Sequence, residues 1–287
     1  MRSFTIFPLM CVLFAAFNLC AESDDLDTQL MFNTFKVSNP KSSATVFVIV
    51  RPSPDDEKKN QYVLVTALHV FTKMEGDEAT LYLRKKEGKD SDEWAKVAVK
   101  LKVREDGNAL WTKHPSADVA VLPFTPPQDA PVAGLPLSLL ATDEKLKHYE
   151  IHPGDTMKCT GYPHPNQFDT GAAWFPVVRQ GCIAGFPLTP STKYKTFLAD
   201  FNTFEGNSGG PVYFTENNRY YGGKTQEGRI QFILGLLSLQ HFINDKYDNV
   251  YESGTFRHRL CLGVIVNAAM IRETIELIPK GVLKSEK

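Results

Sequence analysis

The chain has 287 residues, of which 32 are lysine or arginine and 33 are aspartate or glutamate, so its formal net charge is −1. This length allows one large or two small domains with sizeable cores, and the balanced charge argues against nucleic acid or an anionic membrane surface as a partner. The hydrophobic fraction of 43% and the charged fraction of 23% are ordinary for a globular protein.

The first 21 residues have the pattern of a secretory signal peptide. An arginine precedes an apolar stretch from residue 4 to residue 20, and Ala21 is followed by a polar, acidic run. We expect cleavage after Ala21, which would make the mature protein secreted or periplasmic and free of the membrane. Two alternatives stay open: an uncleaved anchor, because the stretch is nearly long enough to span a bilayer, and a lipid anchor on Cys20.

Residues 28–124 are expected to form a first β-rich domain. Short apolar, β-branched runs are separated by charged loops, as in strand-rich folds; the runs are 44–50, 62–67, 81–84, 98–103 and 119–124. His69 follows the second of these runs closely, and Asp118 immediately precedes the last one. Both side chains are therefore expected at strand ends.

A proline-rich connector, residues 125–139, leads to a second domain at 140–287. Its predicted strands are again short; they are 157–161, 177–185, 196–199, 211–214, 232–239 and 260–266. A closing helix is expected where Asn267 can cap an amphipathic segment that Pro279 terminates. Many short strands with polar turns favour an all-β sandwich or barrel.

The turn at residues 206–211 (GNSGGP) is the most informative segment of the chain. Glycines let backbone amides point into a site, so the N–H groups of Gly206 and Ser208 are candidates for an oxyanion hole. The hydroxyl of Ser208 needs a base to become a nucleophile. His69 is the candidate base, because histidine suits proton transfer near neutral pH, and Asp118 is the candidate carboxylate that orients it. The alternative is a glycine-rich turn with a solvent-facing serine.

Three segments in the order His, Asp, Ser carry a family resemblance: residues 66–69 (TALH), 118–122 (DVAVL) and 206–211. Together they resemble the chymotrypsin-like serine peptidases, and bacterial secreted or HtrA-type members more than digestive trypsins. The resemblance spans residues 43–278. It implies two six-stranded antiparallel β-barrels, a C-terminal helix, and an active site between the barrels. We expect the chain to end before the PDZ domain that many HtrA-type enzymes carry.

By this resemblance, residues 235–240 match the strand that holds the substrate backbone and walls the specificity pocket. The expected substrate-binding residues are Asn202, at the pocket floor, Thr203, Ser238, Leu239 and Gln240. Asparagine is neutral, so a strong preference for arginine or lysine is not expected.

The residue before the nucleophile is Asn207, where zymogen-activated relatives carry an aspartate that pairs with a newly cut N-terminus. A neutral amide cannot form that ion pair. We therefore expect activity without trypsinogen-type cleavage.

Three cysteines remain after the predicted signal cleavage, so at most one intramolecular disulfide is expected. Cys159 and Cys182 are the preferred pair, because the resemblance makes their strands neighbours, and Cys261 is left over. His148 and His152 lie four residues apart, but Pro153 follows and the segment looks like a loop. We therefore expect no metal site and no cofactor.

The function expected from these residues is an exported serine endopeptidase that acts on protein or peptide substrates through an acyl-enzyme. The alternative is a peptidase-like fold used for binding, with an impaired triad. An esterase would use the same chemistry, but the fold resemblance disfavours it.

Overall fold

The structure is a computed structural model that describes residues 25–54, 56, 59–88, 91–163 and 170–279. The predicted signal peptide lies outside the described residues. In the described part of the chain, no helix is long and apolar enough to cross a membrane.

The first sheet contains the long strands of the N-terminal half, and its hydrogen-bonded order is β5-β4-β1-β2-β3-β9-β8, with β10 added in parallel beside β2. Its strands are β1 (Thr34–Ser38), β2 (Ser43–Pro52), β3 (Asn60–Thr66), β4 (Glu78–Lys86), β5 (Trp94–Lys102), β8 (Thr112–Lys113), β9 (Ala120–Phe124) and β10 (Leu135–Pro136). Two further short strands, β6 (Arg104–Glu105) and β7 (Asn108–Ala109), pair only with each other. Six long antiparallel strands are present, as expected.

The hydrogen-bond ladder of this first sheet does not close between β5 and β8 in the described part of the chain. The outer strand β5 has the alternating exposed pattern of an edge strand, with lysines facing solvent. Its edge is met by the second half of the chain: the amide of Lys96 donates to the carbonyl of Ala172 at 3.2 Å.

The second sheet is a closed six-stranded barrel in the order β11-β12-β13-β16-β15-β14. Its strands are β11 (Thr156–Gly161), β12 (Val177–Ile183), β13 (Thr196–Asp200), β14 (Pro211–Tyr221), β15 (Lys224–Asp248) and β16 (Ser253–Asn267). The structure therefore has the expected all-β architecture of two sheets, followed by the expected C-terminal helix.

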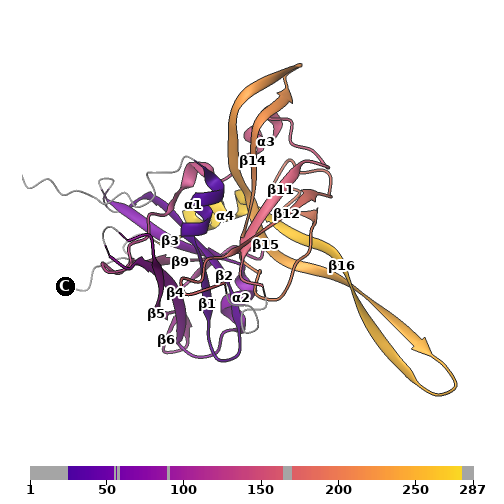
Figure 1. Cartoon of the computed structure of the whole chain (residues 1–287), viewed down its shortest axis with the longest axis horizontal. Coiled ribbons are helices and arrows are strands. Elements are labelled where there is room, and N and C mark those ends of the chain that lie inside the picture. Colours follow the sequence, from indigo (N-terminus) through magenta and orange to yellow (C-terminus); the bar gives the residue numbers. More distant parts are fainter. Residues whose placement is uncertain (1–24, 55, 57–58, 89–90, 164–169, 280–287) are drawn as a thin grey trace, which may run out of the picture.

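Strands β14, β15 and β16 are much longer than the sequence predicted. They continue beyond the barrel as two projecting hairpins, one formed by β14 and β15 and the other by β15 and β16 (Figure 1). The first hairpin turns at Gly222 and Gly223, whose φ angles are +59° and +78°, as in a type I′ turn. In these extensions single apolar residues alternate with polar and charged ones, so an apolar-run criterion misses them. The Gly-Gly pair, in contrast, is a hairpin signal in its own right.

The helices are α1 (Leu26–Asn33), α2 (Leu68–Lys73), the 3₁₀ helix η1 (Leu137–Leu139), α3 (Asp143–His148) and α4 (Ala268–Glu276). The closing helix α4 is confirmed, and the side chain of Asn267 caps it by accepting from the amide of Ala269 at 3.0 Å. Helix α1 was not predicted. Its Asp27 contacts Tyr213 and Lys158 of the second barrel at 2.7 and 2.6 Å, while the next residues enter β1 of the first sheet, so α1 ties the two halves together.

Arg84 forms a second tie between the halves. One guanidinium nitrogen donates to the Tyr162 hydroxyl at 2.8 Å and the Trp174 carbonyl at 3.1 Å, and the other donates to the carbonyls of Met31 and Thr34 at 2.8 and 2.7 Å. The guanidinium is almost fully buried. No local sequence motif indicates a role for this arginine.

The preferred disulfide between Cys159 and Cys182 does not form, because all three described cysteines are free. Their strands β11 and β12 are neighbours, as expected, but Cys159 lies opposite Arg179, and Cys182 lies opposite Thr156. This offset of three residues is about 10 Å along a strand, beyond the reach of a disulfide. Burial raises the pKa of Cys159 to about 12, so its thiol stays protonated in the core.

Candidate active site

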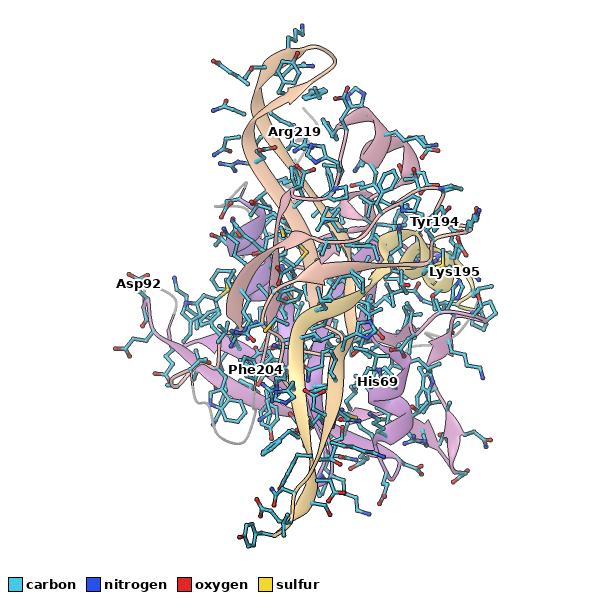
Figure 2. The ribbon with its side chains drawn as sticks, turned by 90° about the vertical axis from the view of Figure 1, so that its right-hand side faces the viewer. His69, Asp92, Tyr194, Lys195, Phe204 and Arg219 are labelled. Atoms are coloured by element: carbon cyan, nitrogen blue, oxygen red, sulfur yellow. The ribbon has the colours of Figure 1, made fainter. Side chains whose placement is uncertain are left out.

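The first sheet holds His69 at the end of β3. Strand β3 stops at Thr66, and α2 begins at Leu68, so the histidine is the second residue of a short helix. The buried side chains of Val70 and Phe71 fix this helix to the core, and the imidazole is left half-buried at the surface. Figure 2 shows it beside the long β15–β16 hairpin.

Asp118 lies two residues before β9, which pairs with β3, so the two strand ends place it beside His69. One carboxylate oxygen lies 2.7 Å from His69 Nδ1, and the other accepts from the backbone amide of His69 at 2.9 Å. This double contact fixes the orientation of the ring. With the proton on Nδ1, the other ring nitrogen is free to accept one.

The hydroxyl of Ser238 also donates to Asp118, at 2.5 Å. Burial by itself raises the pKa of Asp118, but the hydrogen bonds from His69 and Ser238 outweigh burial and lower it below its usual range. The carboxylate therefore stays ionised beside the imidazole. Ser238 was predicted only as a substrate-binding residue, and the structure adds this contact.

The second barrel supplies Ser208, on the tight turn between β13 and β14. Its hydroxyl donates to the carbonyl of Ser238 at 3.2 Å. In the described part of the chain this is its one hydrogen bond, so none joins it to His69. Ser238 nevertheless connects the three residues, because its hydroxyl bonds Asp118 and its carbonyl bonds Ser208.

The turn around Ser208 is anchored by its carbonyl groups. Thr45 in β2 donates its hydroxyl to the Gly206 carbonyl at 2.7 Å and its amide to the Ser208 carbonyl at 3.0 Å. The same hydroxyl accepts from the amide of Tyr162 at 3.1 Å. No sequence pattern indicates Thr45, because the contact joins residues more than 160 positions apart.

The amides of Gly206 and Ser208 have no acceptor among the described residues. Gly206 has a φ of +95° and Gly209 a φ of +85°, which L side chains rarely adopt. At Gly209 a Cβ atom would also collide with Thr66 and with the backbone of Thr45. The glycines of the turn thus allow close packing against the first sheet while leaving two amides unpaired.

His69 and Asp118 lie on the antiparallel first sheet, and Ser208 lies on the closed six-stranded barrel. This arrangement of two sheets and three residues identifies the fold. The fold is chymotrypsin-like. No family model matches the chain, and no curated protein matches it.

Solved structures similar to the chain include the inactive form of the Rv3671c protease, with 16% sequence identity, coverage of 87% of this chain and 90% of that one, and a TM-score of 0.45. The Ser343Ala mutant of Rv3671c from M. tuberculosis, also an inactive form, has 18% identity, coverage of 88% and 92%, and a TM-score of 0.41. The scabies mite inactivated protease paralogue S-D1 has 10% identity, coverage of 87% and 92%, and a TM-score of 0.46.

The predicted specificity residues occupy different environments in this chymotrypsin-like fold. Thr203 is buried, and its hydroxyl donates to the side-chain oxygen of Gln240 at 2.8 Å, so these two residues lie together. Leu239 is exposed. Asn202 is also exposed, and its side-chain oxygen accepts from the thiol of Cys261 at 3.2 Å.

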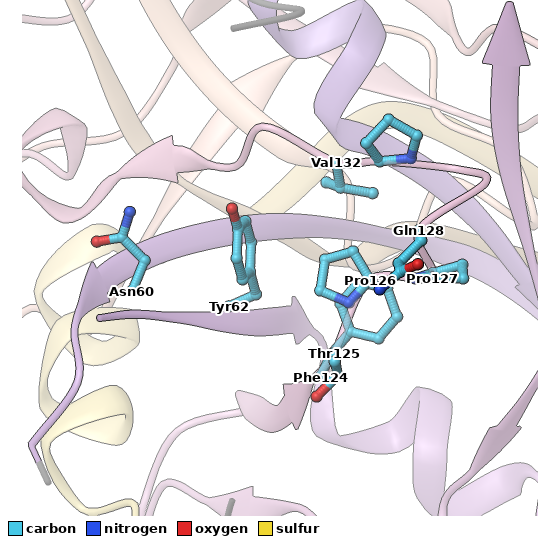
Figure 3. Close-up of a pocket in the computed structure, with 9 residues that line it drawn as sticks. Asn60, Tyr62, Phe124, Thr125, Pro126, Pro127, Gln128 and Val132 are labelled. Carbon is cyan, nitrogen blue, oxygen red and sulfur yellow. The ribbon is translucent and has the colours of Figure 1, made fainter. Parts of the chain in front are cut away.

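A hollow of about 330 Å³ lies elsewhere, under the connector between the two halves (Figure 3). Its lining residues are Asn60, Tyr62, Phe124, Thr125, Pro126, Pro127, Gln128, Pro131 and Val132. It adjoins the start of β3 and the end of β9, whereas His69 follows the end of β3 and Asp118 precedes β9. The hollow is thus at the opposite end of these strands from the site. The described residues contain no group of three or more potential metal ligands.

Proposed function

We propose that this protein is an exported serine endopeptidase that hydrolyses peptide bonds through an acyl-enzyme. The observation that carries the proposal is the connected set His69–Asp118–Ser238–Ser208, together with the amides of Gly206 and Ser208, which have no acceptor among the described residues. The N-terminal pattern of residues 1–21 supports export.

In the proposed mechanism, Ser208 Oγ attacks the substrate carbonyl carbon while His69 Nε2 takes the hydroxyl proton. The amides of Gly206 and Ser208 donate to the oxyanion that forms. His69 then protonates the departing amine, which leaves an acyl group on Ser208, and water activated by His69 releases it. Rotation about χ1 of Ser208 exchanges the Ser238 carbonyl for the imidazole as hydrogen-bond partner. Asp118 stays ionised throughout and stabilises the imidazolium.

We further propose that the enzyme does not need trypsinogen-type cleavage. Asn207 is neutral and buried, so it offers no carboxylate to a new N-terminal ammonium. Thr45 supplies instead a fixed anchor for the same turn through the Gly206 and Ser208 carbonyls. The neutral Asn202 and the contact of Gln240 with Thr203 support a pocket without strong arginine or lysine preference.

A fluorophosphonate probe on the folded mature protein tests the proposal. We expect labelling of the wild type and of Ser138→Ala, which removes an exposed hydroxyl elsewhere, and loss of labelling in Ser208→Ala. A folded wild type that does not react would instead favour the alternative, a binding protein with an impaired triad. A cleavage profile dominated by basic residues before the scissile bond would refute the pocket assignment.

A further inference from the structure

The hairpin formed by β15 and β16 carries most of the large hydrophobic side chains that are exposed in the described part of the chain. We call its residues 239–260 the arm. Of the ten large hydrophobic side chains that are exposed in the described part of the chain, six belong to the arm, and they are Leu239, Ile243, Val250, Tyr251, Phe256 and Leu260. Val250 and Tyr251 at its tip are 94% and 96% exposed. Such a concentration of apolar side chains marks an interaction surface.

The arm is held in shape by contacts between its own strands. The rings of Tyr247 and Phe256 stack with centroids 4.8 Å apart, and the Arg257 guanidinium lies 3.6 Å from the Phe242 ring centroid. The ladder between β15 and β16 continues out to Asp248 and Ser253. A partner would therefore meet a preformed strand, which lowers the entropic cost of binding.

One edge of β15 is free from Ser238 onward. Strand β14 pairs with β15 only as far as Leu236. The last backbone contacts on that side are made by Leu237, whose amide donates to the carbonyl of Gly210 and whose carbonyl accepts from the amide of Gly209. Strand β16 covers the opposite edge along the whole arm. From Ser238 to Asp248, among the described residues, no strand pairs with the first edge, which is about 35 Å long at the usual rise per residue.

This free edge begins at the proposed nucleophile, because the carbonyl of Ser238 accepts the hydrogen bond from Ser208 Oγ. Figure 2 shows the arm running outward beside His69. A polypeptide that added to β15 as an antiparallel strand, with its scissile bond at Ser208, would lay its preceding residues along the arm. A second copy of the chain is the competing occupant, but continuity with Ser208 favours a substrate.

We infer that the arm is an extended substrate-docking edge. It takes the segment on the amino side of the scissile bond, as an unfolded, strand-forming stretch of about ten residues rich in apolar side chains. The inference rests on the proposed endopeptidase function and adds a substrate class to it. Backbone hydrogen bonds to the free edge give affinity, and the exposed apolar side chains of the arm select apolar neighbours.

The test compares fluorogenic peptides that share one cleavable sequence and carry four or ten residues on its amino side. We expect kcat/KM to be about tenfold higher for the longer peptide, mainly through KM. N-methylation of alternate amides in the added residues should remove this gain, because it blocks strand pairing without changing the protein. The ratio of long to short kcat/KM should fall in Ile243→Lys/Phe256→Lys and persist in Phe186→Lys/Tyr220→Lys, a control at exposed apolar positions outside the arm.

Binding of the same fluorescent peptides to Ser208→Ala, followed by anisotropy, separates docking from catalysis. If no peptide is cleaved, the proposed function fails, yet tighter binding of the long peptide would still support the docking edge. The inference would be overturned if the long and short peptides had nearly equal kcat/KM values and nearly equal affinities for Ser208→Ala. So would a gain from residues added only on the carboxyl side, or a wild-type dimer in sedimentation that Ile243→Lys/Phe256→Lys dissociates.

Discussion

Thr45 offers the sharpest test of how this site is held together. Its hydroxyl is the hydrogen-bond partner of two buried backbone groups, the Gly206 carbonyl at 2.7 Å and the Tyr162 amide at 3.1 Å. The change Thr45→Val keeps the shape of the side chain and removes both contacts. Thr45→Ser keeps the hydroxyl and is the matched control.

The expected loss follows from these two contacts. A buried polar group left without a partner costs about 1–3 kcal/mol. Thr45→Val leaves two such groups and should lower the free energy of unfolding by about 2–6 kcal/mol, with Thr45→Ser much closer to the wild type. The catalytic effect is separate. Without its anchor, the peptide at Gly206 can rotate, and loss of one oxyanion donor reduces kcat by about 10²–10³-fold.

Because the turn is still held by the Thr45 amide, we expect an intermediate effect: kcat lower by about 10–100-fold in Thr45→Val, with KM nearly unchanged. Steady-state kinetics on a peptide substrate and the rate of fluorophosphonate labelling measure it, below the melting temperature of the variant. The reasoning is refuted if folded Thr45→Val keeps the wild-type kcat within twofold, or if Thr45→Ser loses as much as Thr45→Val.

Three further predictions concern buried groups around the site. Asn207→Asp places a carboxyl group at a buried position, so its folded pKa should rise. The variant should then lose stability relative to the wild type as the pH increases above about 4. The same difference in unfolding free energy between variant and wild type at pH 4 and pH 8 would contradict this. Ser238→Ala removes a hydrogen bond that lowers the pKa of Asp118. The stabilisation from ionised Asp118 is present above its unfolded pKa and is lost as the pH falls through its folded pKa. In this variant the acid-induced decrease in the free energy of unfolding should therefore begin at a higher pH. A decrease at the wild-type pH would contradict the role of this contact. Arg84→Lys loses the planar fork that reaches four backbone and hydroxyl oxygens and should cost about 3 kcal/mol or more in urea unfolding, whereas Lys96→Arg on the edge strand should cost less than about 1 kcal/mol.

The sequence predicts the candidate catalytic residues of the site better than the contacts that hold them in place. The nucleophile turn is readable because its glycines are adjacent in the chain, and His69 and Asp118 are readable because each borders an apolar strand. These are local signals. The contacts of Ser238 with Asp118 and Ser208 join residues that are 120 and 30 positions apart, and serine at that position gives no indication of them.

The strands that form the cores follow from the local pattern of apolar and β-branched residues, and the C-terminal helix follows from a cap and a proline. The sequence by itself therefore determined the all-β class, the order His69, Asp118, Ser208 and the glycine turn, because each depends on neighbours within a few residues. Only the tertiary structure decided the strand register that keeps Cys159 from Cys182, the anchoring of the turn by Thr45, and the outward continuation of β15 and β16 into the arm. These features depend on which distant strands pair and at what offset, and a single residue's identity does not specify its partner across the fold.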